Sequence, residues 1–189
     1  MIIRAKAPLR LGFGGGGTDV SPYVEEHGGA VLNATINRFA YASLRPHEEK
    51  KIEIISRDFQ SRVVYRSDGT ISGDKKLDLL KAVLHHFAKD LPESGFKAEL
   101  HTDVPPSSGV GSSSAVVTAL VGAVIEWLGQ NHSSYEIAKK AFQIERVELG
   151  VPGGRQDQYA AAFGGFNYIE FTKEEVIVNP LRIPRSLIN

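Results

Sequence analysis

Small residues gather in one stretch of the chain, residues 105–115, which read PPSSGVGSSSA. The glycines let backbone amides approach an anion, and the serines lead into residues 113–128, which are apolar on nearly every face. The N-terminus of such a helix adds unpaired N–H donors and a partial positive charge. The stretch therefore predicts a phosphate-binding loop at the start of a central, buried helix. An ordinary serine-capped helix after a proline turn is the structural alternative.

This loop differs from a Walker loop, because no lysine follows its glycines and no Gly-x-x-x-x-Gly-Lys-Ser/Thr sequence occurs in the chain. Serine hydroxyls can instead donate hydrogen bonds to phosphate oxygens or ligate Mg²⁺. The predicted phosphate ligands are therefore the backbone amides, the serines and the helix N-terminus.

A second glycine cluster, residues 12–17 (GFGGGG), follows a predicted first strand. Read literally, Gly12-x-Gly14-x-x-Gly17 after a strand is a dinucleotide-binding fingerprint. That fingerprint requires a full helix after it, whereas Pro22 and Gly28-Gly29 leave room for only a turn or two. We therefore disfavour a nicotinamide or flavin site. A purely structural turn stays open, although four successive glycines carry a conformational cost that a turn does not require.

Strands and helices alternate irregularly along the rest of the chain. Strands are predicted where β-branched and aromatic residues are frequent: 31–44, 51–57, 62–66, 96–102, 165–171 and 175–183, the first three as an antiparallel set. Helices are predicted over 77–91, 113–128, 133–149, which opens with a capping box, and 157–163. The lack of a regular βαβ repeat predicts an α+β fold, in which a two-layer mixed sheet packs on helices.

Composition limits the class of protein. At 189 residues with 42% hydrophobic content, the chain can bury one sizeable core. Its 22 basic residues balance 22 acidic ones, so no net field attracts nucleic acid or a membrane surface, and any anion must be held locally. Cysteine is absent, and the longest apolar stretch, residues 115–125, is shorter than the ~20 residues of a membrane span. We therefore expect a cytoplasmic protein without nucleic-acid or membrane partners.

The two glycine regions together resemble the galactokinase, homoserine kinase, mevalonate kinase and phosphomevalonate kinase (GHMP) superfamily. Residues 105–115 match its second signature, Pro-x-Ser-Ser-Gly-x-Gly-Ser-Ser-Ser-Ala, and residues 7–19 (APLRLGFGGGGTD) look like its first. The resemblance implies a fold of the ribosomal protein S5 domain 2-like type. It implies that the ATP triphosphate is wrapped by Pro106, Ser107, Ser108, Gly109, Val110, Gly111, Ser112, Ser113 and Ser114. It also implies that the acceptor is lined by Gly15, Gly16, Gly17, Thr18 and Asp19.

The same resemblance assigns roles to charged residues. Asp157, in residues 153–159 (GGRQDQY), corresponds to the proposed base in the Gly-Ile-Met-Asp-Gln-Phe segment of galactokinases, and Arg10 to a basic residue near the transferred phosphate. Glu145 and Ser113 correspond to the Mg²⁺ ligands, and Asp19 to an acceptor of sugar hydroxyls. The residues alone leave alternatives: Arg10 on a strand surface, Asp19 or Asp157 as a helix cap, and Glu145 on a solvated charged face.

The first signature also bears on the acceptor. Galactokinases have glutamate and histidine where this chain has Gly16 and Gly17, which counts against galactose. The form LRLxFxGGGTD, followed by GAVLNATI at residues 29–36, instead resembles the heptose 7-phosphate kinases. This implies transfer of the γ-phosphoryl group of ATP, with Mg²⁺, to the anomeric hydroxyl of D-glycero-D-manno-heptose 7-phosphate, in nucleotide-heptose biosynthesis. The alternatives are another GHMP sugar kinase, such as a fucokinase, or an inactive nucleotide-binding fragment.

The resemblance extends from Ile3 to about Phe171. Members of the superfamily are longer and carry a C-terminal domain with a third glycine-rich signature, which nothing after Phe171 resembles. We therefore expect residues 1–189 to form the N-terminal ATP-binding domain, and the C-terminal domain that completes the enzyme to be absent from this chain. The sequence leaves the oligomeric state open.

Overall fold

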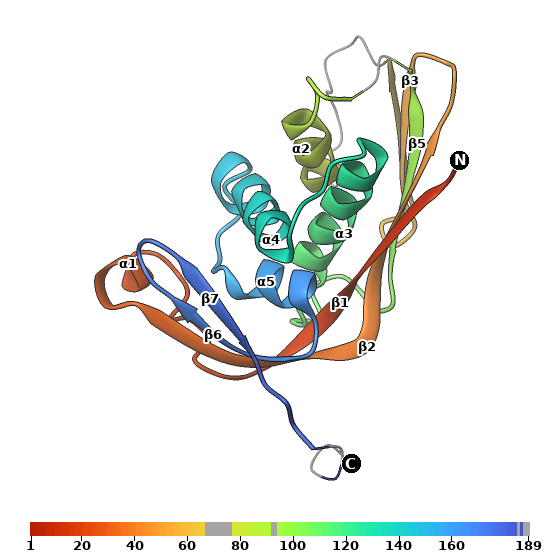
Figure 1. Ribbon diagram of the computed structural model, residues 1–189. Coiled ribbons are helices and arrows are strands. Elements are labelled where there is room, and N and C mark those ends of the chain that lie inside the picture. Colours follow the sequence, from red (N-terminus) through yellow and green to blue (C-terminus); the bar gives the residue numbers. More distant parts are fainter. Residues whose placement is uncertain (67–76, 92–93, 185, 187–189) are drawn as a thin grey trace.

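A mostly antiparallel sheet forms one layer of the molecule, and helices pack inside the bend of this sheet (Figure 1). The structure is a computed structural model that describes residues 1–66, 77–91, 94–184 and 186. Within these residues the strands are β1 (Ile3–Gly14), β2 (Gly29–Pro46), β3 (Lys51–Ser56), β4 (Ser61–Arg66), β5 (Phe96–Thr102), β6 (Phe166–Phe171) and β7 (Val176–Pro180). The α+β prediction of a mixed sheet packed on helices is confirmed.

The long strand β2 organises the sheet. The strand order is β4-β3-β5-β2-β6-β7, and β1 pairs with β2 along its other edge. The first half of β2 pairs with β6 and its second half with β5, so one strand joins both ends of the sheet. The first half of β2 thereby lies between the glycine cluster that ends β1 and strand β6, at one end of the sheet.

The predicted neighbours within the sheet are partly wrong. Strands β3 and β4 form the expected antiparallel pair, but β5 lies between β2 and β3 and runs parallel to β3. A parallel pair needs a long crossover, and the chain between β3 and β5 supplies one that includes β4 and a helix. Local composition identifies each strand, whereas the crossover determines which strands become neighbours.

The helices agree with the predicted segments, with different ends. They are α1 (Tyr23–His27), α2 (Asp78–His86), α3 (Ser112–Trp127), α4 (Ser134–Phe142), the π-helical segment η2 (Gln143–Glu148) and α5 (Gln156–Phe163). The capping box predicted at the start of α4 is confirmed, because Ser133 and Glu136 satisfy each other's backbone N–H groups. The α-helix predicted to run on to residue 149 instead widens into η2, a π-helical turn of a kind that is frequent at functional sites.

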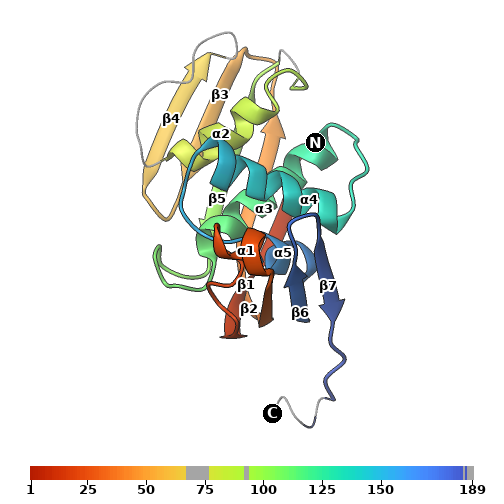
Figure 2. The ribbon, with the colours of Figure 1, turned by 90° about the vertical axis from the view of Figure 1, so that its left-hand side faces the viewer.

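Helix α3 lies at the centre of the core. Val117, Leu120, Val121 and Val124 are fully buried, as its all-round apolar sequence predicts, and the helix packs on β1 and β2. In both views α2 lies beside β3 and β5, while α5 lies over the end of the sheet formed by β1, β2, β6 and β7 (Figure 2). Within the described part of the chain, no helix is long and apolar enough to cross a membrane.

Candidate active site

The serine and glycine loop joins β5 to the N-terminus of α3. Its residue Gly111 precedes the helix with φ +73°, and Ser107 and Gly109 also adopt positive φ angles of 65° and 75°. Gly111 has no side chain that could cap the helix, and no acidic residue lies in the first turn of α3. The serine-capped alternative is therefore wrong. The first-turn N–H groups of α3 lack a capping side chain and remain suited to an anion.

Arg10 connects the two glycine regions. Its backbone N–H donates to the carbonyl oxygen of Val110 (3.0 Å), and its Nη1 donates to the carbonyl oxygen of Gly109 (3.2 Å). Its Nε and Nη2 both lie 2.6 Å from Oδ1 of Asp157. Only 18% of the Arg10 side chain is exposed, so the alternative of a surface strand residue is wrong.

Asp157 lies in the first turn of α5 and faces Gly111. Arg155 is the residue before the helix, and its side chain makes no capping bond. Asp157 is therefore not a helix cap. A Cβ atom on Gly111 would lie 3.3 Å from Cγ of Asp157 and 3.5 Å from Cγ of Arg10. The absence of a side chain at residue 111 thus keeps the phosphate loop in close contact with the Arg10–Asp157 pair.

Asp19 caps α5 from a distant part of the chain. Its Oδ2 accepts from the backbone N–H of Gln156 at 2.9 Å, and only 2% of the residue is exposed. A Cβ atom on Gly154 would lie 2.0 Å from the same oxygen, so a glycine is needed there. Helix α1, by contrast, follows Pro22 without a side-chain cap. The alternative that Asp19 caps the short helix is therefore wrong, because it caps the helix that carries Asp157 instead.

Tyr159 anchors α5 on its buried side. Its ring packs edge-on against Phe171 and Tyr135, with ring centroids 6.4 and 6.3 Å away. Burial raises the pKa of the Tyr159 phenol, so this group stays neutral near pH 7. Helix α5 is thus held at its N-terminus by the carboxylate of Asp19 and on its buried side by the packing of Tyr159.

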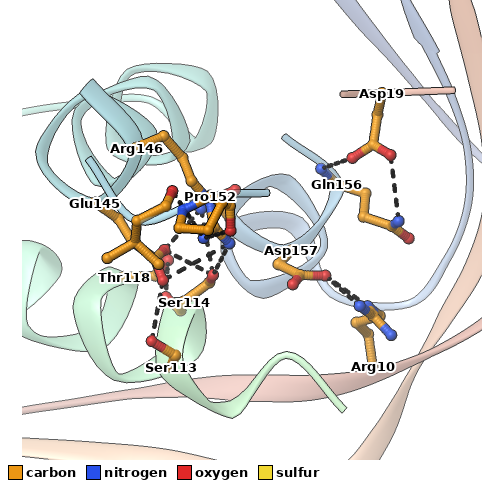
Figure 3. A network of polar contacts seen from close by, with 12 residues as sticks. Arg10, Asp19, Ser113, Ser114, Thr118, Glu145, Arg146, Pro152, Gln156 and Asp157 are labelled. Atoms are coloured by element: carbon orange, nitrogen blue, oxygen red, sulfur yellow. Dashed lines mark hydrogen bonds and ion pairs between the residues drawn. The ribbon is translucent and has the colours of Figure 1, made fainter. Parts of the chain in front are cut away.

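Glu145 is fully buried and fully engaged, not part of a solvated face (Figure 3). Its Oε1 accepts from the hydroxyl of Ser113 at 3.0 Å. Its Oε2 accepts from the hydroxyl of Ser114 and from Nε2 of Gln158, both at 2.7 Å. Nη2 of Arg146 lies 3.7 Å from Oε1 and supplies the nearby positive charge. The structure thus brings Ser113 and Glu145 together, although 31 residues separate them along the chain.

Ser113 and Glu145 have the chemistry of a magnesium site. Mg²⁺ prefers oxygen ligands and often takes only one or two carboxylates, with phosphate oxygens and water completing its shell. Among the described residues there is no cluster of three or more His, Asp or Glu that could hold a metal. A Mg²⁺ ion that is bound together with a nucleotide needs no such cluster, because the phosphates supply part of its ligands. Metal binding by this pair would replace their 3.0 Å hydrogen bond by two metal–oxygen contacts.

A pocket of about 510 Å³ opens beside the phosphate loop. Ser107, Ser112 and Ser113 line one part of it, and apolar side chains line much of the rest: Leu79, Leu80, Leu100, Val116, Leu149 and Val151. These come from four elements or their ends, so no local pattern in the sequence could have marked them. The pocket suits a flat, mostly apolar ring whose attached anionic group would reach the serine and glycine loop.

Sequence reasoning missed three polar residues of the site. Gln158 donates to Glu145 and Ser114, and Arg146 donates to Ser114 and to the carbonyl oxygens of Val151 and Pro152. Gln156 flanks Asp157 and contacts Asp19. Gln156 and Gln158 both lie next to Asp157 in the sequence. That proximity was the one signal in the sequence that could have marked them as residues of the site.

Comparison with known proteins agrees with this geometry. The family model for the GHMP kinases N terminal domain matches residues 78–165. The chain is 47% identical over 184 residues to the D-glycero-alpha-D-manno-heptose 7-phosphate kinase of Campylobacter jejuni, covering 96% of this chain and 54% of that protein. The chain thus spans about half the length of this relative.

Solved structures give the same family. A D-glycero-D-manno-heptose 1-phosphate kinase from Bacteroides thetaiotaomicron superposes with a TM-score of 0.91 at 44% identity, covering 100% of this chain and 62% of that one. Lactococcus lactis galactokinase complexed with galactose shares the fold, with a TM-score of 0.75 at 19% identity over 97% of this chain and 48% of that one. Over nearly its whole length the chain is therefore similar to GHMP kinases, and residues 78–165 match the N-terminal domain of that family.

Proposed function

We propose that the protein containing this chain is an ATP-dependent kinase that phosphorylates the anomeric hydroxyl of D-glycero-D-manno-heptose 7-phosphate. The observation that carries the proposal is the contact between Arg10 and Asp157 at the place where the two glycine regions meet. A guanidinium and a carboxylate are thereby held beside a loop suited to phosphate. The choice of acceptor rests on the 47% identity to a protein named as a heptose 7-phosphate kinase.

The nucleotide would occupy the loop and the pocket beside it. Residues 106–114 would hold the triphosphate through backbone amides and serine hydroxyls, with the N-terminus of α3 supplying partial positive charge. The apolar pocket lined by Leu80, Val116 and Val151 would take the adenine ring. Mg²⁺ would be held by Ser113 and Glu145. When bound, it would neutralise charge on the β- and γ-phosphates.

The acceptor would lie between the first glycine cluster and α5. Gly15, Gly16 and Gly17 would offer backbone amides, with Thr18 and Asp19 shaping the loop. Asp157 would take or orient the proton of the attacking hydroxyl, because one oxygen is bonded to Arg10 and the other has no bonded partner among the described residues. Arg10 would neutralise charge on the transferred phosphoryl group.

A second domain would complete this site. The relatives are longer than this chain. We propose that the part of them that this chain does not match corresponds to the C-terminal domain expected from the sequence. We also propose a cytoplasmic location, as expected from the sequence, because ATP is available in the cytoplasm. A fucokinase remains the competing assignment among enzymes, and a nucleotide-binding fragment without activity remains the competing assignment for residues 1–189 alone.

A kinase assay against a panel of acceptors tests the proposal. The full-length protein and residues 1–189 should each be supplied with ATP, Mg²⁺ and one of heptose 7-phosphate, heptose 1-phosphate, free heptose, fucose or galactose. We expect turnover by the full-length protein to be highest with the 7-phosphate. Higher kcat/KM on fucose would replace the heptose assignment, and binding of ATP without turnover of any sugar would reject a sugar kinase.

A further inference from the structure

The first glycine loop has few side chains left with which to recognise a sugar. Three of its five proposed acceptor residues are glycines. The hydroxyl of Thr18 is used within the loop, because it lies 2.8 and 3.0 Å from the carbonyl oxygens of Gly15 and Ala30 and accepts from the N–H of Ala30. Asp19 is 2% exposed and bonded to α5. Side-chain hydrogen bonds to an acceptor must therefore come from elsewhere.

Gln156 reaches over this loop from α5. A Cβ atom on Gly12 would lie 3.7 Å from Oε1 of Gln156, and one on Gly16 would lie 3.9 Å from its Nε2. The side-chain amide thus lies across the bare backbone of the loop. Figure 3 shows it next to Asp19, on the side of α5 that also presents Asp157 to Arg10.

The amide of Gln156 is held in place but retains free hydrogen-bonding capacity. Nε2 lies 3.4 Å from Oδ1 of Asp19, which leaves its second N–H free, and Oε1 has no bonded partner within the described residues. The residue is half-buried. A half-buried amide with one free donor and one free acceptor suits a sugar hydroxyl, which both donates and accepts.

We infer that Gln156 is a specificity-determining residue that hydrogen-bonds a hydroxyl of the acceptor sugar, and that Asp19 acts as a positioning residue for it. The inference rests on the proposed function, since it assumes an acceptor in this loop. Asp19 holds both the backbone N–H and the side-chain amide of Gln156, so it fixes the direction in which the amide faces. By binding one hydroxyl of the sugar, Gln156 would orient the acceptor so that its anomeric hydroxyl faces Asp157, the next residue in the chain.

Substituting Gln156→Met in the full-length protein tests this role. Methionine has about the same length, lacks hydrogen-bonding groups, and stands at this place in the galactokinase segment quoted above. We expect kcat/KM for the best acceptor to fall about tenfold, as for a lost hydrogen bond to a partly buried group, with KM for ATP unchanged. Gln130→Met, on an exposed loop far from the site, is the matched control and should change neither constant.

Deoxygenated acceptors, each lacking one hydroxyl, identify the partner. For one analogue, removal of the hydroxyl should cost about tenfold in the wild type and almost nothing in Gln156→Met, because the bond is already lost. If Gln156→Met does not fold, Gln156→Asn, whose shorter amide cannot reach, replaces it with the same expectation. Equal costs in both proteins for every analogue, or kcat/KM within twofold of wild type, would overturn the inference while leaving the kinase assignment intact. Failure of the wild type on every sugar would reject the proposed function itself.

Discussion

Glu145 and Asp157 both lie against the N-terminus of α3, but they are exposed to different extents. Glu145 is fully buried and accepts hydrogen bonds from three side chains, those of Ser113, Ser114 and Gln158. The Asp157 side chain is 18% exposed, and its hydrogen bonds come from Arg10 alone within the described residues. The two carboxylates have the same chemistry in different surroundings.

This difference indicates different tasks. A buried carboxylate surrounded by hydrogen-bond donors, such as Glu145, is held rigidly. Such a group suits the role of a metal ligand, for which position matters more than reactivity. A carboxylate with one oxygen free can accept a proton from a substrate that enters. The proposed nucleotide side of the site is therefore preformed by the chain's own groups, whereas the proposed acceptor side keeps unused hydrogen-bonding capacity at Asp157 and Gln156. Substitutions on the two sides should separate these tasks.

The largest effect on kcat with ATP binding retained is expected for Asp157→Asn in the full-length enzyme. The amide keeps the shape and can still accept from Arg10, and α5 remains capped by Asp19. We expect kcat to fall by about 10²–10⁴ with nearly unchanged ATP affinity, and an anomeric hydroxyl, being fairly acidic, places the effect toward the lower end. Steady-state kinetics and calorimetry with a non-hydrolysable ATP analogue measure both. A variant that retains more than about a tenth of kcat would show that Asp157 is not the base.

Gly111→Val should affect both sides at once. The residue has φ +73°, where a side chain costs roughly 1–2 kcal/mol, and its Cβ would press on Asp157 and Arg10. We expect ATP binding to be abolished in calorimetry while the far-UV circular dichroism spectrum is retained, because the side chain blocks backbone approach to phosphate. Gly129→Val, also at positive φ but with open space around it, controls for backbone strain alone. Unchanged ATP affinity in folded Gly111→Val would reject the phosphate-loop assignment.

Glu145→Gln tests the nucleotide side by its dependence on metal. We expect nucleotide affinity measured with Mg²⁺ to fall about tenfold or more, and affinity measured with EDTA to change less. Glu148→Gln, on the exposed face of the same π-helical turn, is the matched control and should leave both affinities unchanged. Equal losses with and without Mg²⁺ would give Glu145 a structural role only.

The smallest catalytic effect is expected for Gln158→Leu. This change removes the donor to Glu145 and Ser114 from a fully buried position. We expect a loss of about 1–3 kcal/mol in the free energy of unfolding, measured with urea, and an activity change of only a few-fold. Gln143→Leu, at an exposed position on η2, should leave stability nearly unchanged. If Gln158→Leu is as stable as wild type, the side-chain amide of Gln158 does not stabilise the buried cluster around Glu145.

Local sequence patterns account for much of the fold. The apolar run at 113–128 predicted a central helix observed at Ser112–Trp127, and the capping box at Ser133 and Glu136 formed as expected. These features depend on residues that are close in the chain, so propensity and periodicity suffice to find them.

Tertiary structure alone decided which distant residues meet. Arg10 contacts Asp157 across 147 residues, Asp19 caps α5 and not the adjacent α1, and β5 inserts between β2 and β3. Gln156 and Gln158 show the limit clearly, because two identical side chains two residues apart face the acceptor loop and the buried Glu145 cluster, respectively. A helix turns by about 100° per residue, so its sequence fixes the angle between these side chains. What each side chain meets depends on how the completed sheet and helices pack around it.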